Sequence, residues 1–501
     1  MKIKHIILGI GCLLFLISQH SCIDDRGSSA FQSVEEMMPV KITEMKDTTV
    51  DIMENLKIEP EITGLEEGRE YRYLWYAAPS ETAGFAPQRD TLSQERNVDF
   101  TVKYESGTYN LVFEVRDVEH NIYARTQLLM TVASNFAYGW YVLKEEANKT
   151  DIDFVLPDET VKSNVIRTLG MEPLDGKPMA LGYQTGRYYH QIDNPDGTVT
   201  TLMNKKAIYV LSGNDLRILN ADNMSAFKPS FSECFYESPL EKRPQNIHTA
   251  GGDAYLINAG KMHSIYGSSP NIGKFSYAKT GVYDLHNDLV GFSSFGDVTV
   301  WDKMSRTFFY TSGAGSTLNK YSDQTDAESP IQISPSDMSL ELIRLLKRRD
   351  YYPVTAYAIM KNSDKEEYYL ADMEMSGYPF QSFDTLPTHC KMPKADVMAA
   401  HGISACIYFA KGSELSVYRQ IESSDREAVI KTFPGETISF IGNIRSTNKK
   451  DKFNHLVVVT NNADGWKLYR FEMIGETPDI KTEPLKVYSG KGIATYAMFR
   501  I

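Results

Sequence analysis

Alternating apolar and polar positions in the early part of the chain predict a run of short strands. Residues 71–75 and 109–116 carry aromatic and aliphatic side chains at every second position. This period places one set of side chains on a core face and the other set outward. Residues 117–132 give a polar turn followed by a returning strand, which indicates a hairpin. With Trp75 as the central tryptophan, the pattern favours an immunoglobulin-like or PKD-like β-sandwich over residues 34–133.

Residues 140–501 show a different pattern. An apolar strand, a tight turn with Gly, Asn or Asp, and a second strand repeat along this region. These pairs are 207–211 with 216–219, 255–257 with 261–266, 289–292 with 298–301, 356–360 with 367–371, 403–409 with 415–418, and 456–460 with 466–471. The later pairs begin about 50 residues apart, which is typical of β-propeller repeats. We therefore predict an all-β chain whose second domain is a propeller of about seven blades. Unrelated hairpins in two sandwiches are the alternative.

Both ends of this second region look like strands. Residues 140–143 and 494–501 are rich in apolar and aromatic side chains. If the two segments pair within one blade, the ring closes and no sheet edge is left open. Residues 134–139 break the pattern and mark the predicted boundary between the domains.

One stretch has helical spacing. It begins at Ser334-Pro335, where proline suits the first helical position, and ends at Arg348-Arg349, near the negative end of a helix dipole. Its apolar residues fall on one helical face: Met338, Leu342, Leu345 and Leu346. The pattern predicts a helix inserted between blades and packed on the ring, with a partner-binding helix as the alternative.

The N-terminus has the pattern of a lipoprotein leader. Apolar residues 6–17 follow a short basic segment, and this run is shorter than the roughly 20 residues that a membrane-spanning helix needs. Residues 1–21 are therefore predicted to be a signal peptide. Ser21 supplies the small residue before the cut, so Cys22 would become the N-terminus and carry a lipid. An ordinary secreted protein is the alternative.

An acidic tag follows the predicted lipid site. Asp24 and Asp25 lie at the start of a small, polar segment, residues 22–33, which we expect to be a flexible tether. The tag resembles that of Bacteroidetes-type lipoproteins exported to the outer face of the outer membrane. The resemblance implies a lipid-anchored protein exposed at the cell surface. Alternatively, the two aspartates only solvate the tether.

Composition narrows the function. The 501 residues include 53 Lys and Arg against 65 Asp and Glu, a formal net charge of −12. Nucleic acid is therefore not an expected partner, because phosphate contacts need clustered cations. Apart from Cys12 and Cys22 the cysteines are Cys234, Cys390 and Cys406, too few for a disulfide scaffold and without zinc-like spacing. One bridge at most can form, and Cys406 is expected to be a buried apolar residue.

Several motifs together resemble the PKD-like family of Bacteroidetes lipoproteins. They are Cys22–Asp25, Leu56–Ile62, Tyr73–Tyr76, Ser93–Asn97, Gly107–Val112, Gly139–Leu143 and Tyr255–Lys261. The resemblance covers the leader and first domain well and the rest loosely. It implies an accessory lipoprotein encoded beside outer-membrane nutrient-uptake systems of the starch-utilisation type, and it brings no catalytic residues. The Trp-Asp-Phe-Gly-Asp-Gly signature of true PKD domains is absent, so their calcium or ligand properties are not carried over.

The densest group of potential ligands is Asp284, His286 and Asp288. In an extended chain the three side chains would share one face and could serve a metal or acid–base site. In a turn, Asp284 and Asn287 would cap the backbone instead, and we favour that interpretation. We assign no metal and no cofactor. Gly251-Gly252 precedes a predicted strand and not a helix, which favours a bend over a phosphate loop.

Two aromatic groups are candidates for ligand stacking. Tyr188-Tyr189-His190 and Tyr351-Tyr352-Pro353 are expected near loops, where ring faces stack on sugars or peptides. Half-buried packing is the more common role of such residues. Loops of many blades converge on one propeller face, so we expect a non-enzymatic surface lipoprotein that captures a glycan or peptide, with the sandwich as spacer or docking module. The alternatives are a hydrolase or lyase that uses carboxylates or Asp284 and His286 on that face, and a structural subunit of an uptake complex.

Overall fold

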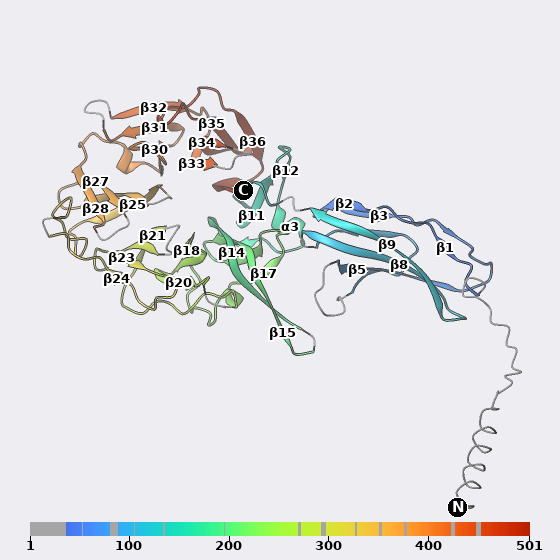
Figure 1. Cartoon of the computed structure of the whole chain (residues 1–501). Coiled ribbons are helices and arrows are strands. Elements are labelled where there is room, and N and C mark those ends of the chain that lie inside the picture. The colour runs from blue at the N-terminus through green and yellow to red at the C-terminus, as the bar shows by residue number, and fades with distance from the viewer. Residues whose placement is uncertain are drawn as a thin grey trace, which may run out of the picture. The chain divides into compact units, whose positions relative to one another are not determined.

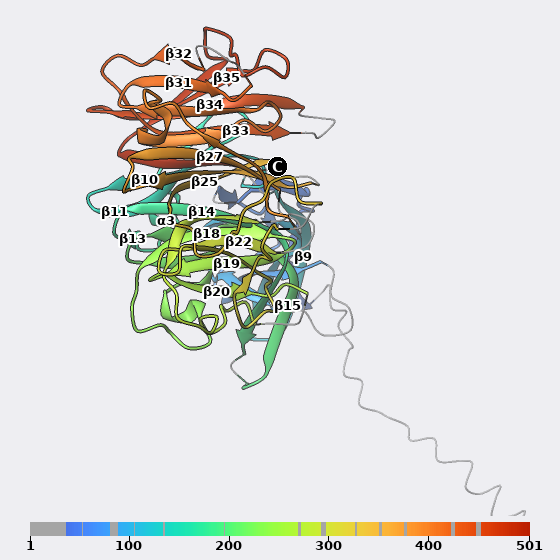
Figure 2. The same ribbon diagram turned by 90° about the vertical axis from the view of Figure 1, so that its left-hand side faces the viewer.

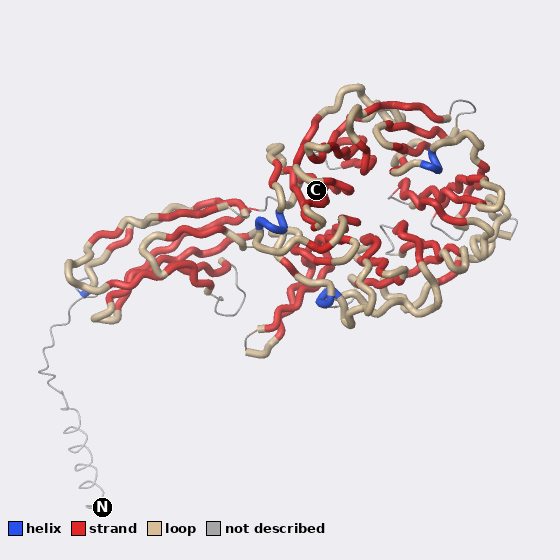
Figure 3. The backbone as a smooth tube through the Cα atoms, turned by 180° about the vertical axis from the view of Figure 1, so that it is seen from behind, coloured by secondary structure: helices blue, strands red, loops and turns tan. Residues whose placement is uncertain are grey.

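The computed structural model describes most of the chain from residue 37 to residue 500. The described ranges are 37–52, 54–80, 89–104, 106–133, 136–194, 196–268, 272–291, 297–325, 328–349, 353–374, 378–421, 426–446 and 452–500. Cys22, Asp24 and Asp25 lie outside them, as do the predicted leader and tether. Strands dominate and helices are short (Figure 3). Within these ranges no helix has the length and apolar character needed to cross a membrane. The chain divides into two compact units, formed mainly before and after residue 133.

The N-terminal unit is built on a five-stranded antiparallel sheet. Its order is β2 (Thr48–Asp51), β9 (Ile122–Ala133), β8 (Gly107–Asp117), β5 (Tyr71–Pro79) and β6 (Asp90–Ser93). Two small sheets pair β1 (Lys41–Ile42) with β4 (Ile62–Thr63) and β3 (Asn55–Ile58) with β7 (Val98–Thr101). The Trp75 ring is fully buried and stacks on Phe113 with 4.5 Å between centroids. The hairpin predicted at residues 117–132 is confirmed, since Asp117 pairs with Ile122.

Seven sheets make up the described part of the C-terminal unit, and we number them as blades (Figure 1). Blade 1 consists of β14 (Pro178–Asp193), β15 (Val199–Ser212), β16 (Leu216–Asn220) and β17 (Ala226–Lys228). Blade 2 consists of β18 (Pro244–Ala250), β19 (Asp253–Asn258) and β20 (Lys261–Ile265). Blade 3 consists of β21 (Leu285–Gly291), β22 (Val298–Asp302), β23 (Thr307–Thr311) and β24 (Asn319–Lys320). Blade 4 consists of β25 (Glu341–Arg349), β26 (Thr355–Asn362), β27 (Glu367–Glu374) and β28 (Phe380–Thr385). Blade 5 consists of β29 (Val397–Ala400), β30 (Cys406–Lys411), β31 (Glu414–Arg419) and β32 (Glu427–Thr432). Blade 6 consists of β33 (Thr437–Ser446), β34 (Phe453–Asn462), β35 (Gly465–Glu472) and β36 (Lys486–Gly490).

Blade 7 joins the two ends of the unit. It holds β12 (Val161–Lys162), β11 (Lys149–Val155), β10 (Gly139–Glu146) and β37 (Ile493–Arg500), and β13 (Leu174–Asp175) also pairs with β11. The register of β10 and β37 runs from Gly139 opposite Arg500 to Glu145 opposite Ile493. The predicted pairing of the two terminal segments, and with it the closure of the ring, is confirmed.

The first strand of each blade, or β37 in blade 7, lines the axis of the ring. Each of these inner strands contacts the next, in the order β14, β18, β21, β25, β29, β33, β37 and back to β14. The contacts of β37 with β14 show that these two strands run in the same direction. The Thr495 hydroxyl near the start of β37 donates to the carbonyl of Pro178 at the start of β14, at 3.4 Å. The Arg500 guanidinium at the end of β37 lies 4.8 Å from the ring centre of Tyr183, further along β14. The carboxyl ends of the inner strands therefore meet at one mouth of the channel, which we call the carboxyl mouth.

Apolar side chains pack between neighbouring blades. One cluster joins Tyr357 and Ile359 of blade 4 to Ile407 and Phe409 of blade 5, all nearly or fully buried. This packing explains the near-continuous apolar central strands, because both faces of each inner sheet are covered. The β14–β15 hairpin is the exception, since its outer part extends beyond the ring (Figures 1 and 2).

The helix predicted between Ser334-Pro335 and Arg348-Arg349 is wrong. Residues 341–349 form β25, the inner strand of blade 4. Its pairing with β26 shifts between Leu342 and Arg344 and again between Lys347 and Arg349. An irregularity of this kind breaks the period of two, so Leu342 and Leu345 reach one core cluster although they are three residues apart. The bulged strand thus imitates helical spacing.

Candidate functional site

The structure separates Asp284 from His286 and Asp288, which lie close to each other. Asp284 lies just before β21, and its carboxylate forms an ion pair with Lys303 at 3.0 Å. His286 and Asp288 lie on β21, with 3.8 Å between Nδ1 and Oδ2. The pairing of β21 with β22 is irregular between Leu285 and Leu289. Asp284 therefore does not converge with His286 and Asp288 on one point.

His286 and Asp288 are already committed to backbone contacts. The Asp288 amide donates to His286 Nδ1 at 3.1 Å, and the Leu345 amide donates to Asp288 Oδ2 at 3.0 Å. Burial lowers the pKa of His286, while the Asp288 carboxylate acts in the opposite direction. Asp288 thus ties blade 3 to the irregular inner strand of blade 4. Among the described residues no three or more His, Cys, Asp or Glu side chains gather as a metal site would require.

A hairpin turn forms one wall of a pocket at the carboxyl mouth. Ala250 pairs with Asp253, and Gly251 and Gly252 between them have φ values of 60° and 93°. Positive φ at both central positions is the type I′ geometry that glycine permits. A Cβ on Gly252 would lie 2.6 Å from Arg187 Cδ, so only glycine lets the arginine approach. The predicted bend before a strand is confirmed.

A bulge in β14 forms the opposite wall. Gln184 pairs with Ala207 and Tyr188 pairs with Lys205, so Thr185–Arg187 oppose the single residue Lys206. Arg187 has a φ of 58°, which is uncommon outside glycine. Bulges re-aim side chains and leave backbone groups outside the ladder, and they are frequent beside functional sites. Here the bulge turns the backbone of blade 1 toward the end of β18.

The pocket between these walls has a volume of about 530 Å³. Its lining consists of Tyr183, Gln184, Thr185, Gly186, Arg187, Thr249, Ala250, Gly251 and Gly252. Hydroxyl, amide, guanidinium and backbone groups therefore predominate. This size and polarity suit a small hydrophilic ligand.

Hydrogen bonds between blades 1 and 2 fix the pocket walls. Gln184 donates to the Gly252 carbonyl at 2.6 Å, and Thr249 donates to the Tyr183 carbonyl at 2.8 Å. Arg187 Nη1 donates to the Gly251 carbonyl at 3.1 Å and to Ser268 Oγ at 3.3 Å. The walls are thus held before any ligand arrives, which reduces the entropy lost on binding.

Of the first predicted aromatic group, Tyr188 belongs to the core, and Tyr189 and His190 are half-buried. Tyr188 is fully buried, its hydroxyl donates to the Gly273 carbonyl at 2.9 Å, and its ring stacks on Phe227 at 5.0 Å. Burial raises the pKa of the Tyr188 phenol well above its ordinary value. Tyr351 and Tyr352, in the second group, lie outside the described residues.

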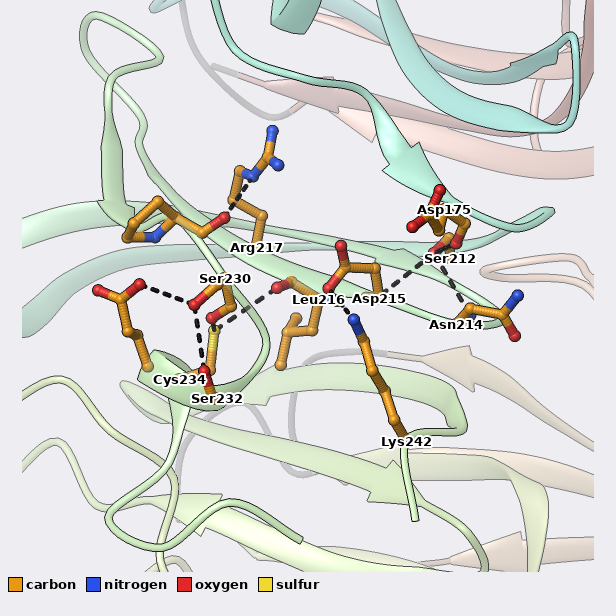
Figure 4. Close-up of polar contacts among 12 residues, drawn as sticks. Asp175, Ser212, Asn214, Asp215, Leu216, Arg217, Ser230, Ser232, Cys234 and Lys242 are labelled. Carbon is orange, nitrogen blue, oxygen red and sulfur yellow. Dashed lines mark hydrogen bonds and ion pairs between the residues drawn. The ribbon is translucent and has the colours of Figure 1, made fainter. Parts of the chain in front are cut away.

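The three described cysteines are free and buried. The Cys234 thiol donates to the Ser230 carbonyl, with 3.3 Å between sulfur and oxygen, and lies 3.7 Å from the Leu216 carbonyl oxygen (Figure 4). Burial raises the pKa of the Cys234 thiol, and it raises the pKa of Cys406 to about 12. These thiols therefore stay protonated at neutral pH, which leaves them weak nucleophiles. The expected burial of Cys406 is confirmed.

Sequence comparison identifies the first domain. A model of the PKD-like family matches residues 22–178. The chain carries an N-terminal PKD-like domain. No curated protein matches the sequence significantly.

Structural comparison finds distant likenesses over most of the chain. One is a quinonprotein alcohol dehydrogenase-like protein from Bacteroides thetaiotaomicron, with 12% identity over 92% of this chain and 97% of that chain and a TM-score of 0.47. Another is the dihydro-heme d1 dehydrogenase NirN, with 10% identity over 85% of this chain and 74% of that chain and a TM-score of 0.37. The Dos1 propeller shares 9% identity over 70% of this chain and 85% of that chain, also with a TM-score of 0.37.

The pocket residues were not predicted from the sequence, except for the bend at Gly251-Gly252. A weak signal exists, because Gly186 interrupts an otherwise strand-like run and glycine within a strand often marks a bulge. The pairing of this bulge with a turn more than 60 residues later follows from the order of the blades and from no local motif.

Proposed function

We propose that this protein is a lipid-anchored, non-enzymatic binding protein of the bacterial cell surface that captures a small hydrophilic nutrient. The observation that carries the proposal is the polar pocket of about 530 Å³ at the carboxyl mouth. Its walls are held by hydrogen bonds across two blades, and its bulged backbone offers groups outside the strand ladder. Pre-formed concave sites with a few oriented polar groups are the usual architecture of small-molecule recognition.

The PKD-like domain supports a role as a spacer. The small β-sandwich, which lies in the chain between the proposed anchor and the propeller, would act as a spacer or docking module. We propose Cys22 as the lipid attachment residue, with Asp24 and Asp25 directing export to the outer face of the outer membrane. Outer-membrane uptake proteins would then be the partners that receive the captured ligand.

A ligand screen with two matched variants tests the binding proposal. Thr185 and Thr201 are both exposed threonines of the β14–β15 hairpin, but only Thr185 lines the pocket. Purified protein is screened against oligosaccharides and short peptides, and each hit is measured with Thr185→Trp and Thr201→Trp. We expect Thr185→Trp to abolish binding by filling the pocket, and Thr201→Trp to leave it unchanged. Turnover of a bound compound, or binding that survives Thr185→Trp, would contradict the proposal.

Fractionation of cells tests the anchor. Cys22→Ala removes the thiol that would accept the lipid, so the variant should move from the membrane to soluble fractions. Protease treatment of intact cells should degrade the wild-type protein if it faces outward. A Cys22→Ala variant that stays with the membrane would refute lipid anchoring, whereas protection from protease would refute only the surface location.

A further inference from the structure

Positive charge gathers at the carboxyl mouth of the ring. The described inner strands carry seven Lys and Arg residues: Arg187, Arg344, Lys347, Arg348, Arg349, Arg445 and Arg500. All except Arg344 fall in the second half of their strand. The carboxylates on the same described strands are Asp193 in the projecting hairpin, Asp288 in the middle of β21 and Glu341 at the start of β25. This cationic mouth belongs to a chain whose formal net charge is −12.

The amino ends of the inner strands have the opposite character. Glu341 begins β25, and Asp284, Asp396 and Glu436 directly precede β21, β29 and β33. Arg243 and Lys177 precede β18 and β14, and the Arg243 side chain is paired with Glu241 at 2.7 Å. On the inner strands themselves basic groups predominate toward the carboxyl end, and acidic groups flank the amino end; Asp253 and Asp297 are carboxylates next to the carboxyl mouth.

Several cations at the carboxyl mouth are already neutralised or buried. Arg348 pairs with Asp372 at 3.2 Å and donates to the Ile403 carbonyl, also at 3.2 Å. Arg500 is 1% exposed and pairs with Asp222 at 3.0 Å. These two arginines belong to the framework and are not offered as ligand contacts.

Arg445 differs because it is exposed and forms no ion pair with any described residue. A Cβ on Gly402 would lie 3.6 Å from Arg445 Cδ, which places this side chain against the end of blade 5. Burial, and to a smaller extent the charges of Arg445 and Arg348, lower the pKa of the neighbouring His401 to about 4. Lys347 likewise adds to the lowering of the His248 pKa, to about 3, for which burial is the main cause. Cations of the carboxyl mouth therefore act on both histidines.

Arg187 brings this charge into the pocket. Its Nη1 is used by Gly251 and Ser268, and no described residue forms an ion pair with its guanidinium. An arginine fixed at one nitrogen can present the rest of its fork to a carboxylate or sulfate. The remaining lining provides hydroxyl, amide and backbone groups with a single aromatic ring, that of Tyr183. Such a lining suits a ligand rich in hydroxyl groups better than a peptide with apolar side chains.

We infer that the carboxyl mouth binds an acidic oligosaccharide, with Arg187 contacting its carboxylate or sulfate in the pocket and Arg445 of blade 6 attracting it at the same mouth. This inference rests on the proposed capture function and specifies its ligand class. The polar lining of the pocket favours a ligand with hydroxyl groups, and the cations of the carboxyl mouth favour a negatively charged one.

Titration calorimetry on the full chain tests this inference with tetragalacturonate as the probe. Maltotetraose serves as the neutral probe and tetraglutamate as the peptide probe. We expect tetragalacturonate to bind more tightly than either, and to bind more weakly as salt concentration rises. Arg187→Gln should weaken binding about tenfold, because a charge-assisted hydrogen bond is lost. Arg445→Gln should weaken it less, and more at low salt than at high salt.

Arg243→Gln is the matched control, because Arg243 is an exposed arginine at the other end of an inner strand. It should bind tetragalacturonate as the wild type does, and circular dichroism should show all three variants folded. If maltotetraose binds more tightly than tetragalacturonate, the inference of an acidic ligand is wrong, but the proposed capture function stands. Tighter binding of tetraglutamate would overturn the saccharide. If none of the three probes binds, or if Arg243→Gln weakens binding as much as Arg187→Gln, the inference fails.

Discussion

A buried ion pair in the closing blade leads to a sharp stability prediction. Lys144 on β10 and Asp153 on β11 lie 2.9 Å apart, and both side chains are fully buried. Asp153 also accepts hydrogen bonds from Trp466 Nε1 of blade 6 at 2.9 Å and from the Asn164 amide at 2.8 Å. The carboxylate thus joins the blade that closes the ring to its neighbour. Asp153→Ala would remove these contacts and leave the Lys144 ammonium buried without its nearest carboxylate.

The expected cost is large because the buried Lys144 ammonium would keep only the partly exposed Glu146 carboxylate at 3.4 Å and the Lys491 carbonyl at 3.2 Å. Breaking a buried pair from one side costs about 3–5 kcal/mol, whereas an exposed pair contributes at most about 1 kcal/mol. The Lys149–Asp175 pair in the same blade is partly exposed and serves as the matched control. Asp153→Ala should therefore lower the free energy of unfolding by about 3–5 kcal/mol, and Asp175→Ala by less than about 1 kcal/mol.

Urea unfolding followed by circular dichroism measures both variants. The double variant Lys144→Met, Asp153→Leu removes both charges of this pair, so it should be more stable than Asp153→Ala by at least about 1 kcal/mol. An Asp153→Ala variant that loses no more stability than Asp175→Ala would refute the account of ring closure. A double variant no more stable than Asp153→Ala would show that packing and hydrogen bonds, and not the unpaired charge, determine the loss.

Three further predictions concern the framework. Arg500→Ala should lower the free energy of unfolding by about 3 kcal/mol, because the Phe136 and Ala221 carbonyls lose their buried donor; a loss below about 1 kcal/mol in urea unfolding would contradict this. Burial lowers the pKa of His455 to about 4 from an ordinary 6.5, so the unfolded chain binds a proton at a higher pH than the folded chain does. The stability that the neutral, buried imidazole gives the folded chain is complete above pH 6.5 and is lost as the pH falls toward 4. His455→Gln should reduce the slope of stability against pH in that range, and an unchanged slope would count against the assignment. Ellman's reagent should label Cys234, Cys390 and Cys406 only after unfolding; rapid labelling of the native protein would contradict their burial.

Turn motifs between short apolar segments predicted the hairpins of the blades well. The turn between β15 and β16 contains Ser212-Gly213-Asn214-Asp215, and the predicted flanking strands are confirmed. The closure by β10 and β37 was also predicted, since both segments have strand composition and a ring needs its ends joined. The strand β25 was missed because its irregular register gives Leu342 and Leu345 helical spacing.

The pocket could not be predicted because no single segment contains it. It depends on a bulge at Thr185–Arg187, a turn at Gly251-Gly252 and the contact of two inner strands. The grouping of cations is also a property of the ring, since Arg187 and Arg445 belong to blades far apart in the sequence. Asp284, His286 and Asp288 stood out in the sequence because they alternate within five residues, yet the Lys303 contact directs Asp284 away from the other two.

Hydrogen–deuterium exchange of the full chain, with and without tetragalacturonate, tests the central claim most directly. If the carboxyl mouth is the binding site, amides of residues 183–187 and 249–252 should exchange more slowly with the ligand present, and Thr185→Trp should remove this protection. Protection confined to other parts of the chain, or protection that survives Thr185→Trp, would contradict the placement of the binding site at this mouth.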